Sequence, residues 1–244
     1  MRILLAGHPE TTMIWEPLAE RLQEAPLIWG LPGYGTPMPL GFTPTKEGYL
    51  TWLIEKIEQL DEPVDLVGHD WGGILTVRLA SLRPELLRSW ASDVIGVFDP
   101  EHQWHPSARV WQTPGEGEAA IAAGLASTEE EAIEGFGVYG LPREDAIAMR
   151  RGWDETMWSC ALTLYRSAVH VHAEWGPDLA GARARPGLAI VSDDEFVEKD
   201  WHRRAAERAG ARIVELHGLG HWWLAQSPAA GAACLEEFWS SLPG

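Results

Sequence analysis

Two aspartates and a histidine stand where their side chains could act together on one substrate. Asp70 lies at the apex of a Gly-His-Asp-Trp-Gly-Gly turn at 68–73, between an apolar strand-like stretch and a helix-like run that ends before Pro84. Glycines let the backbone pass through such a turn, so the apex side chain projects into a cavity. Asp194 and His221 each follow a later strand-like stretch. Nucleophile, acid and histidine in this order predict a covalent hydrolytic triad.

The carboxylate at the apex decides which chemistry the triad performs. Asp70 has a reference pKa near ~3.9, so it is expected to be ionised at neutral pH and to attack a saturated carbon without a base. The attack gives an alkyl ester, and His221, oriented by Asp194, would activate the water that hydrolyses this ester. Asp193 stands next to Asp194 and is the alternative acid, because the end of a predicted strand can shift by a residue.

Strand-like and helix-like stretches alternate on both sides of the turn. This alternation predicts an α/β fold with a mostly parallel, doubly wound sheet covered by helices on both faces. Residues 1–98 and 178–244 form the predicted core. Ligands in such sheets bind beyond the carboxyl ends of the strands, where all three triad residues lie. The predicted strands are 2–7, 26–29, 64–67, 88–94, 188–191 and 212–216, and the predicted helices are 15–23, 48–60, 74–83, 201–209 and 228–239.

Residues 99–177 depart from this alternation and are predicted to form a helical lid. The segment lacks clear strand-like stretches and carries joints rich in glycine and proline. Within it, a helix is predicted from Asp154, its N-cap, to about Glu174. Two adjacent apolar stripes predict that this helix lies between two layers. The stripes consist of Met157, Ala161, Leu164 and Ala168, and of Trp158, Leu162, Tyr165 and Val169.

Composition excludes several classes of partner. A formal net charge of −17 over 244 residues argues against binding to nucleic acid or to anionic membranes, because both would repel the chain. Cys160 and Cys234 give neither a disulfide framework nor metal-ligand spacing, so we expect a cytoplasmic protein without metal or cofactor. No apolar run approaches the ~20 residues that span a bilayer. The spacing of the other histidines, such as His102 and His105, supports no metal site either.

The motifs together resemble the α/β-hydrolase superfamily, and within it the branch with an aspartate nucleophile: epoxide hydrolases and haloalkane or haloacid dehalogenases. The turn at 68–73 is similar to the epoxide-hydrolase form nearly residue for residue. Residues 7–11, Gly-His-Pro-Glu-Thr, resemble the oxyanion loop of the family, and residues 220–222 resemble its catalytic-histidine segment. This resemblance implies that the backbone N–H groups of His8 and Trp71 form the oxyanion hole.

Two features depart from the family pattern. Ala6 stands where the family usually has a histidine, and the two strands that usually precede the first strand of this chain are absent. The expected sheet is therefore shortened at the N-terminus. His69 is expected only to pack the turn, and the His8 side chain is left open between contact with substrate and with solvent.

The help given to the leaving group separates the branches of the family. An epoxide opens to an alkoxide and needs a proton, whereas a halide prefers indole or amide N–H donors. The run at 164–166, Leu-Tyr-Arg, resembles the lid segment that carries an epoxide-hydrolase tyrosine, here Tyr165, although fluoroacetate dehalogenases have a similar segment. A second lid tyrosine has no match near 107–111. Trp71 follows the nucleophile where haloacid dehalogenases place an arginine, which disfavours a haloacid.

The leading prediction is therefore a hydrolase that opens a small epoxide, or a similar apolar or aromatic electrophile, through an ester on Asp70. The first alternative is a haloalkane dehalogenase with the same triad, in which Trp71, Trp104 and Trp111 would contact substrate and halide. A further alternative is a non-hydrolytic small-molecule binder or biosynthetic isomerase on the same scaffold, since fold alone does not fix function. The oligomeric state is left open.

Overall fold

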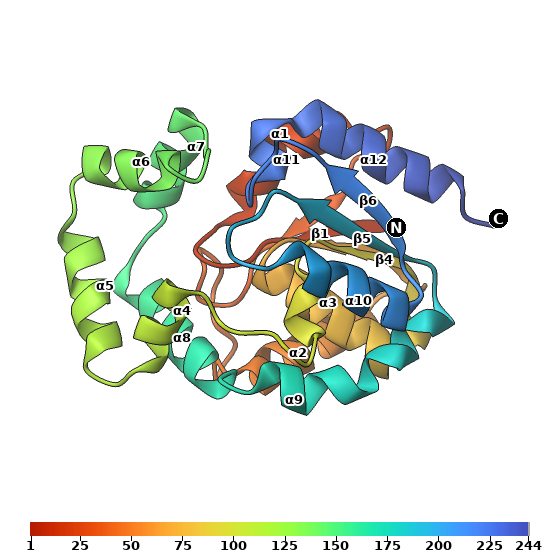
Figure 1. Ribbon diagram of the computed structural model, residues 1–244, viewed down its shortest axis with the longest axis horizontal. Coiled ribbons are helices and arrows are strands. Elements are labelled where there is room, and N and C mark those ends of the chain that lie inside the picture. The colour runs from red at the N-terminus through yellow and green to blue at the C-terminus, as the bar shows by residue number, and fades with distance from the viewer. Residues whose placement is uncertain (244) are drawn as a thin grey trace.

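A single parallel sheet forms the centre of the molecule (Figure 1). The computed structural model describes residues 1–243, and its six strands lie in the order β2-β1-β3-β4-β5-β6 with every neighbouring pair parallel. The predicted α/β class is thus confirmed. The strands are β1 (Arg2–Leu5), β2 (Leu27–Trp29), β3 (Val64–Gly68), β4 (Leu87–Ser92), β5 (Gly187–Ser192) and β6 (Arg212–Leu216).

The order of the strands reverses at β1, which has β2 on one side and β3 on the other. Ligands of open α/β sheets bind at such a switch point, beyond the carboxyl ends of the strands. The register pairs Leu5 with Gly68 and Gly68 with Ser92, so β1, β3 and β4 end at the same height. The loops that follow these three strands therefore begin side by side at one edge of the sheet.

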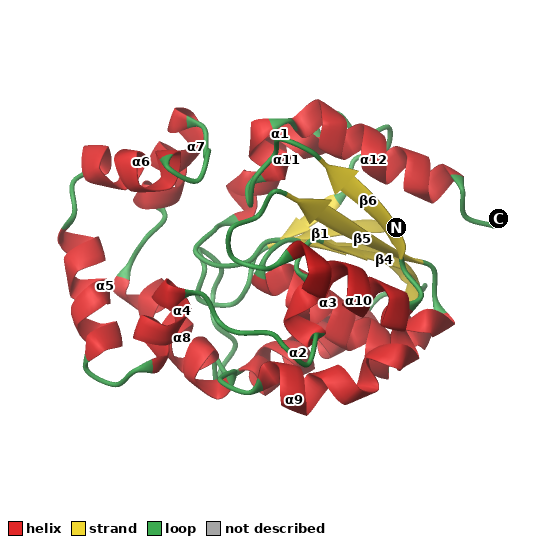
Figure 2. Ribbon diagram, in the orientation of Figure 1, coloured by secondary structure: helices red, strands yellow, loops and turns green. Residues whose placement is uncertain are grey.

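Helices cover both faces of the sheet (Figure 2). Side chains along a strand alternate between the two faces. Ile3 and Leu5 accordingly join the core under α2, α3 and α10, whereas Leu4 joins the core under α1, α11 and α12. These helices are α1 (Glu16–Ala19), α2 (Lys46–Glu58), α3 (Trp71–Leu82), α10 (Lys199–Ala209), α11 (Trp223–Gln226) and α12 (Pro228–Ser240), and the short 3-10 helices are η1 (Thr12–Trp15), η2 (Pro84–Leu86), η3 (Ile95–Phe98) and η4 (Gly176–Ala184).

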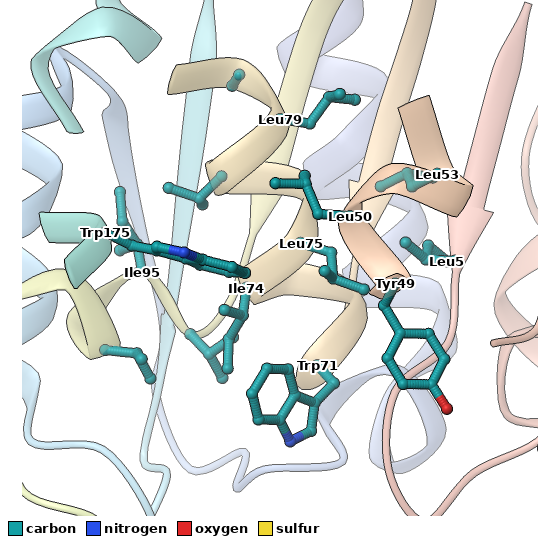
Figure 3. Packing of buried hydrophobic residues seen from close by; sticks show 14 of the residues in the cluster. Leu5, Tyr49, Leu50, Leu53, Trp71, Ile74, Leu75, Leu79, Ile95 and Trp175 are labelled. Atoms are coloured by element: carbon teal, nitrogen blue, oxygen red, sulfur yellow. The ribbon is translucent and has the colours of Figure 1, made fainter. Parts of the chain in front are cut away.

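Helix α3 is packed on nearly all sides (Figure 3). Leu75 and Leu79 lie in one buried cluster with Leu50 of α2 and with Trp175. Burying a leucine side chain contributes about 1.5–3 kcal/mol of hydrophobic stabilisation. The helix that starts directly after Asp70 is therefore firmly anchored. Its packing also holds the end of the turn that leads into it.

Between β4 and β5 the described chain forms six α-helices and no strand. Figure 1 shows α4, α5 and α8 together at one side, with the α6–α7 hairpin above them and apart from the sheet. This stretch covers the range for which a helical lid is predicted. Across residues 1–243, no helix is long and apolar enough to cross a membrane. The six helices are α4 (Pro106–Gln112), α5 (Glu116–Ala126), α6 (Glu129–Gly137), α7 (Arg143–Arg151), α8 (Glu155–Ser167) and α9 (Val171–Trp175).

The single helix predicted from Asp154 to Glu174 is wrong in extent. Asp154 does cap α8, because its side chain accepts the N–H of Met157 at 2.7 Å. The helix ends at Ser167, where the hydroxyl donates back to the Leu164 carbonyl at 2.7 Å and the Trp104 indole donates to the Ala168 carbonyl at 3.0 Å. These bonds replace those that would continue the helix. Val169 consequently falls in the break and is 38% exposed rather than part of a buried stripe.

Candidate active site

Asp70 occupies a strained turn at the carboxyl end of β3. Its φ of 50° and ψ of −125° make it the one non-glycine residue with positive φ in residues 1–243. Such a conformation persists only where the surroundings enforce it. A Cβ at Gly72 would lie 2.3 Å from the carbonyl oxygen of Leu5, so only glycine fits between α3 and β1. The turn therefore projects the Asp70 side chain away from the sheet at the switch point.

The loop after β1 holds one oxygen of this carboxylate. The backbone N–H of His8 donates to Asp70 Oδ1 at 2.7 Å. A Cβ at Gly7 would lie 2.5 Å from the same oxygen, so glycine permits the close approach. The other expected donor, the N–H of Trp71, opens α3, and N–H groups in the first turn of a helix have no partner within it. Of the two expected oxyanion donors, the His8 N–H thus contacts the Asp70 carboxylate, and the Trp71 N–H belongs to the next residue in the chain.

The histidine and the acid meet Asp70 from the far strands. His221 Nδ1 lies 2.9 Å from Asp194 Oδ2, and His221 Nε2 lies 3.8 Å from Asp70 Oδ2. Asp193 instead accepts the N–H of Gly218 at 2.6 Å and pairs with Lys199 at the surface. Of the two carboxylates that the sequence leaves open, the structure brings Asp194 to the histidine.

Burial changes the expected charge of the nucleophile. The pKa of Asp70 is raised to about 7, mainly because burial removes the carboxyl from water; His221 and His69 lower the pKa, and the nearby Glu10 carboxylate raises it. Desolvation disfavours a charged carboxylate, which accounts for the direction. Asp70 is therefore only partly ionised at neutral pH, unlike the exposed aspartate assumed for the sequence alone.

The pKa of His221 is also raised, but by a neighbouring charge rather than by burial. Burial opposes the charged imidazolium, but the hydrogen-bonded Asp194 carboxylate outweighs it and raises the pKa above the usual value, with a smaller contribution from Asp70. An opposite charge within hydrogen-bond distance favours the charged form. Asp70 and His221 each shift the pKa of the other, so neutralising one group changes the pKa of its neighbour.

A second buried charge network lies directly behind the triad and was not foreseen from the sequence. His69 Nε2 lies 2.7 Å from Glu10 Oε1, and His69 Nδ1 is hydrogen-bonded to Asp93. Burial lowers the pKa of His69, but the two carboxylates outweigh this and raise the pKa well above its usual value. The expectation that His69 only packs the turn is wrong, because it is a buried imidazolium between two carboxylates.

Tryptophan indoles complete this network. Trp222 Nε1 donates to Glu10 Oε1 at 2.8 Å, and Trp223 Nε1 donates to Asp93 Oδ2 at 2.7 Å. The other oxygen of Asp93 accepts the N–H of Asp70 at 3.2 Å. Asp93 follows β4 just as Asp194 follows β5, so a carboxylate directly after a strand was the available signal. The network ties the turn that carries Asp70 to the segment that carries His221.

Glu10, His69 and His221 are the one group in the described chain with metal-ligating atoms close together, all within 4.8 Å of one another. A metal ligand must offer a lone pair, so a coordinating histidine must be neutral. His69 is instead held as an imidazolium by its two carboxylates. These residues therefore fit an ion-paired network better than a metal centre.

A cavity of about 200 Å³ opens in front of Asp70 and His221. Nine of its lining residues are aromatic, and no lysine or arginine belongs to the lining. Asp70 is the only carboxylate in the wall. An enclosed apolar pocket with a few polar groups is typical of a small-molecule site. The absence of lysine and arginine from its wall disfavours an anionic ligand.

Of the three tryptophans expected to contact substrate, two line the cavity and one does not. Trp104 and Trp111 line the cavity. Trp71 does not, because its fully buried ring lies behind the wall, stacked on Trp104 with ring centroids 5.9 Å apart. Trp71 also meets the Tyr165 ring edge-on, with centroids 5.4 Å apart. Trp71 thus supports the wall rather than forming it.

Tyr165 lines the same cavity from α8. Its ring contacts Trp71, Trp104, Trp111 and His8. Burial, followed by the charge of Asp70, raises the pKa of the phenol well above its usual value. The hydroxyl is therefore protonated throughout the physiological range and is available as a proton or hydrogen-bond donor.

The family is decided by comparison with a family model. The model of the alpha/beta hydrolase family matches residues 3–233. The chain belongs to this family. The predicted superfamily is thereby confirmed, and the protein is an enzyme of the hydrolase type rather than a binder that merely shares the scaffold. No curated protein sequence matches the chain.

Solved structures of several hydrolases share the fold. A haloalkane dehalogenase variant, DbeA from Bradyrhizobium elkanii, superposes with a TM-score of 0.74 at 20% identity, covering 99% of this chain and 89% of its own. A presumptive epoxide hydrolase from Pseudomonas aeruginosa gives a TM-score of 0.77 at 20% identity, and the match covers 98% of this chain and 88% of the hydrolase. E-2-(Acetamidomethylene)succinate hydrolase gives a TM-score of 0.71 at 17% identity, and the match covers 99% of this chain and 91% of that hydrolase. At these identities the likeness extends to the fold alone.

Proposed function

We propose that this α/β-hydrolase opens small neutral epoxides through an alkyl ester on Asp70. The observation that carries the proposal is a carboxylate at the nucleophile position facing a cavity whose wall includes a protonated tyrosine, Tyr165, and no lysine or arginine. Serine in this position would instead need a base to activate it.

In the first step, an Asp70 oxygen attacks an epoxide carbon. The carbon–oxygen bond of the ring breaks, its electron pair stays on the leaving oxygen, and the Tyr165 hydroxyl supplies the proton. The His8 N–H at 2.7 Å keeps the other carboxylate oxygen oriented. Holding reactants in line can supply about 7–11 kcal/mol of the barrier.

In the second step, His221 removes a proton from water, the resulting hydroxide attacks the ester carbonyl of Asp70, and the acyl carbon–oxygen bond breaks. The diol oxygen leaves with the proton that His221 took up. The Asp70 carboxyl then loses its proton to solvent, and Tyr165 regains one from solvent. The Asp194 contact at 2.9 Å holds the imidazole in place. Esterification removes the Asp70 charge, one of the interactions that raise the pKa of His221. The histidine therefore becomes a free base more readily once the ester has formed, which is when a base is needed.

Oxygen labelling tests the proposed ester. We expect a single turnover of styrene oxide in H₂¹⁸O to place the label in the peptide that contains Asp70, leaving the first diol unlabelled. This follows because water attacks the carboxyl carbon of the enzyme rather than the substrate. Label found only in the first diol, with none in the peptide, would mean direct attack by water and would rule out the ester.

The rate of ester formation is expected to rise with pH. Attack requires ionised Asp70, whose pKa is raised to about 7, so the rate should fall about tenfold per pH unit well below 7 and level off above it. Stopped-flow tryptophan fluorescence under single-turnover conditions from pH 5.5 to 9 measures this. A profile that is flat down to pH 5.5 would contradict a buried, partly protonated nucleophile.

Glu10→Gln is expected to move this profile to lower pH. The Glu10 carboxylate raises the pKa of Asp70, so its neutral counterpart should shift the midpoint down by about one unit. Glu16→Gln, the same change at an exposed position in the same region, is the matched control. Identical midpoints in both variants would show that the network behind the triad does not set the charge of the nucleophile.

Haloalkane dehalogenation with the same triad is the second candidate. It is supported by the buried indole N–H groups of Trp71 and Trp158, which have no hydrogen-bond partner in residues 1–243. Indole N–H groups suit a departing halide, although Trp71 lies behind the wall. Release of bromide from 1-bromobutane, with no diol formed from epoxides, would favour this candidate over the first.

A further inference from the structure

His8 contributes more to the site than its backbone. Its side chain is only 3% exposed and forms part of the cavity wall. Four aromatic rings meet the imidazole edge-on, with centroids 5.0–5.7 Å away. Three of them, Trp111, Trp158 and Tyr165, line the cavity as well. The ring therefore stands among the groups that a bound substrate would touch.

Neither ring nitrogen of His8 has a hydrogen-bond partner in the described part of the chain. Buried polar atoms are nearly always paired, and leaving one unpaired costs free energy. A nitrogen that lacks a protein partner at the edge of a substrate cavity points to a polar group on the substrate as its partner. Burial, with His105 nearby, lowers the pKa of His8 to about 3, so the imidazole is neutral and keeps one N–H.

The other uncharged histidines of the cavity differ from His8. His105 caps α4, where its Nδ1 accepts the N–H of Ala108 at 3.3 Å. Within residues 1–243, His102 likewise has no partner at either ring nitrogen, but it packs against Trp104 and Trp201, and its backbone N–H donates to the Asp99 carbonyl rather than to Asp70. Only His8 combines an unpaired ring with a backbone N–H bonded to the nucleophile. The ring is thereby fixed beside both Asp70 and Tyr165.

We propose that the His8 side chain is a second hydrogen-bond donor to the leaving oxygen, beside the Tyr165 hydroxyl, while the ester on Asp70 forms. This inference rests on the proposed epoxide opening. The proton comes from Tyr165, and His8 keeps its own, lowering the energy of the developing alkoxide by hydrogen bonding alone. The donor would fill the place of the second lid tyrosine that has no match near 107–111.

His8→Phe tests this role because it keeps the backbone N–H and an aromatic ring while removing both ring nitrogens. In single turnovers of styrene oxide, we expect ester formation to slow about 100-fold, as for loss of one donor to a developing oxyanion. Hydrolysis of the ester should stay within about threefold of wild type. His8→Gln, which restores an N–H donor, should recover at least about tenfold of the loss. If the Phe variant fails to fold, His8→Met replaces it.

Three results would overturn the role of His8. Equal rate constants of ester formation in wild type and His8→Phe would show that this step does not depend on the ring. Both steps falling equally would indicate a displaced loop. A Gln variant as slow as the Phe variant would exclude hydrogen-bond donation. Ester formation absent in the wild type as well would instead overturn the proposed function itself.

Discussion

His221→Gln is expected to stop the enzyme after one chemical event and to leave the substrate attached to Asp70. The first step needs only the carboxylate and a proton donor, so ester formation should continue in the variant. The second step needs a base to deprotonate water, and loss of a general base costs about 10²–10⁴ in rate. Steady-state turnover should therefore fall by about 10²–10⁴-fold while one equivalent of ester accumulates.

Intact-mass spectrometry of the variant after incubation with an aryl epoxide measures this ester. A gain equal to the full mass of the epoxide, located by peptide mapping to Asp70, is the expected result. His217→Gln is the matched control, because His217 lies in the same segment with 77% of its side chain exposed. His217→Gln should turn over like wild type. A His221→Gln variant that neither turns over nor carries an adduct would contradict a two-step mechanism.

Local sequence signals predict the parts of the site that depend on one turn or one strand end. The glycines around Asp70 specify the strained turn, and the structure contains it with φ at 50°. Asp194 and His221 lie in the loops that follow β5 and β6, where parallel strands place ligand-binding groups. The choice between Asp193 and Asp194 could not be made, because it depends on which side chain turns inward at the end of β5.

The buried network behind the triad depends on tertiary contacts that no local signal encodes. Glu10, His69 and Asp93 come from the loops after β1, β3 and β4, and the register of these strands brings them together. The position of Trp71 behind the wall depends in the same way on its packing against Trp104. The sequence could mark these residues as polar or aromatic near strand ends, but not their pairing.

The charges around the nucleophile alternate in sign, which accounts for their tolerance of burial. One row runs from Asp194 through His221 to Asp70, and the other from Asp93 through His69 to Glu10. An unpaired buried charge is strongly destabilising, whereas a hydrogen-bonded neighbour of opposite sign offsets the cost. In the proposed mechanism, esterification of Asp70 removes one charge from the first row, and this change prepares His221 to act as a base.

Tyr165→Phe is expected to slow ring opening more than ester hydrolysis. The phenol lines the cavity in front of Asp70 and is protonated at all working pH values. An alkoxide without a proton donor is a poor leaving group, and general acids contribute about 10²–10⁴ in rate. Ester formation from styrene oxide should therefore fall by about 10²–10⁴, whereas attack on 1-bromobutane, whose bromide needs no proton, should change by less than about threefold.

Tyr139→Phe provides the comparison, because Tyr139 lines the same cavity but packs against Phe196 and Trp222 rather than beside Trp71 and His8. Removing its hydroxyl should leave ring opening within about threefold of wild type. If Tyr165→Phe slowed bromide and epoxide reactions equally, the hydroxyl would be shaping the cavity rather than protonating the leaving oxygen. The contrast between the two substrates in one variant therefore separates proton donation from packing.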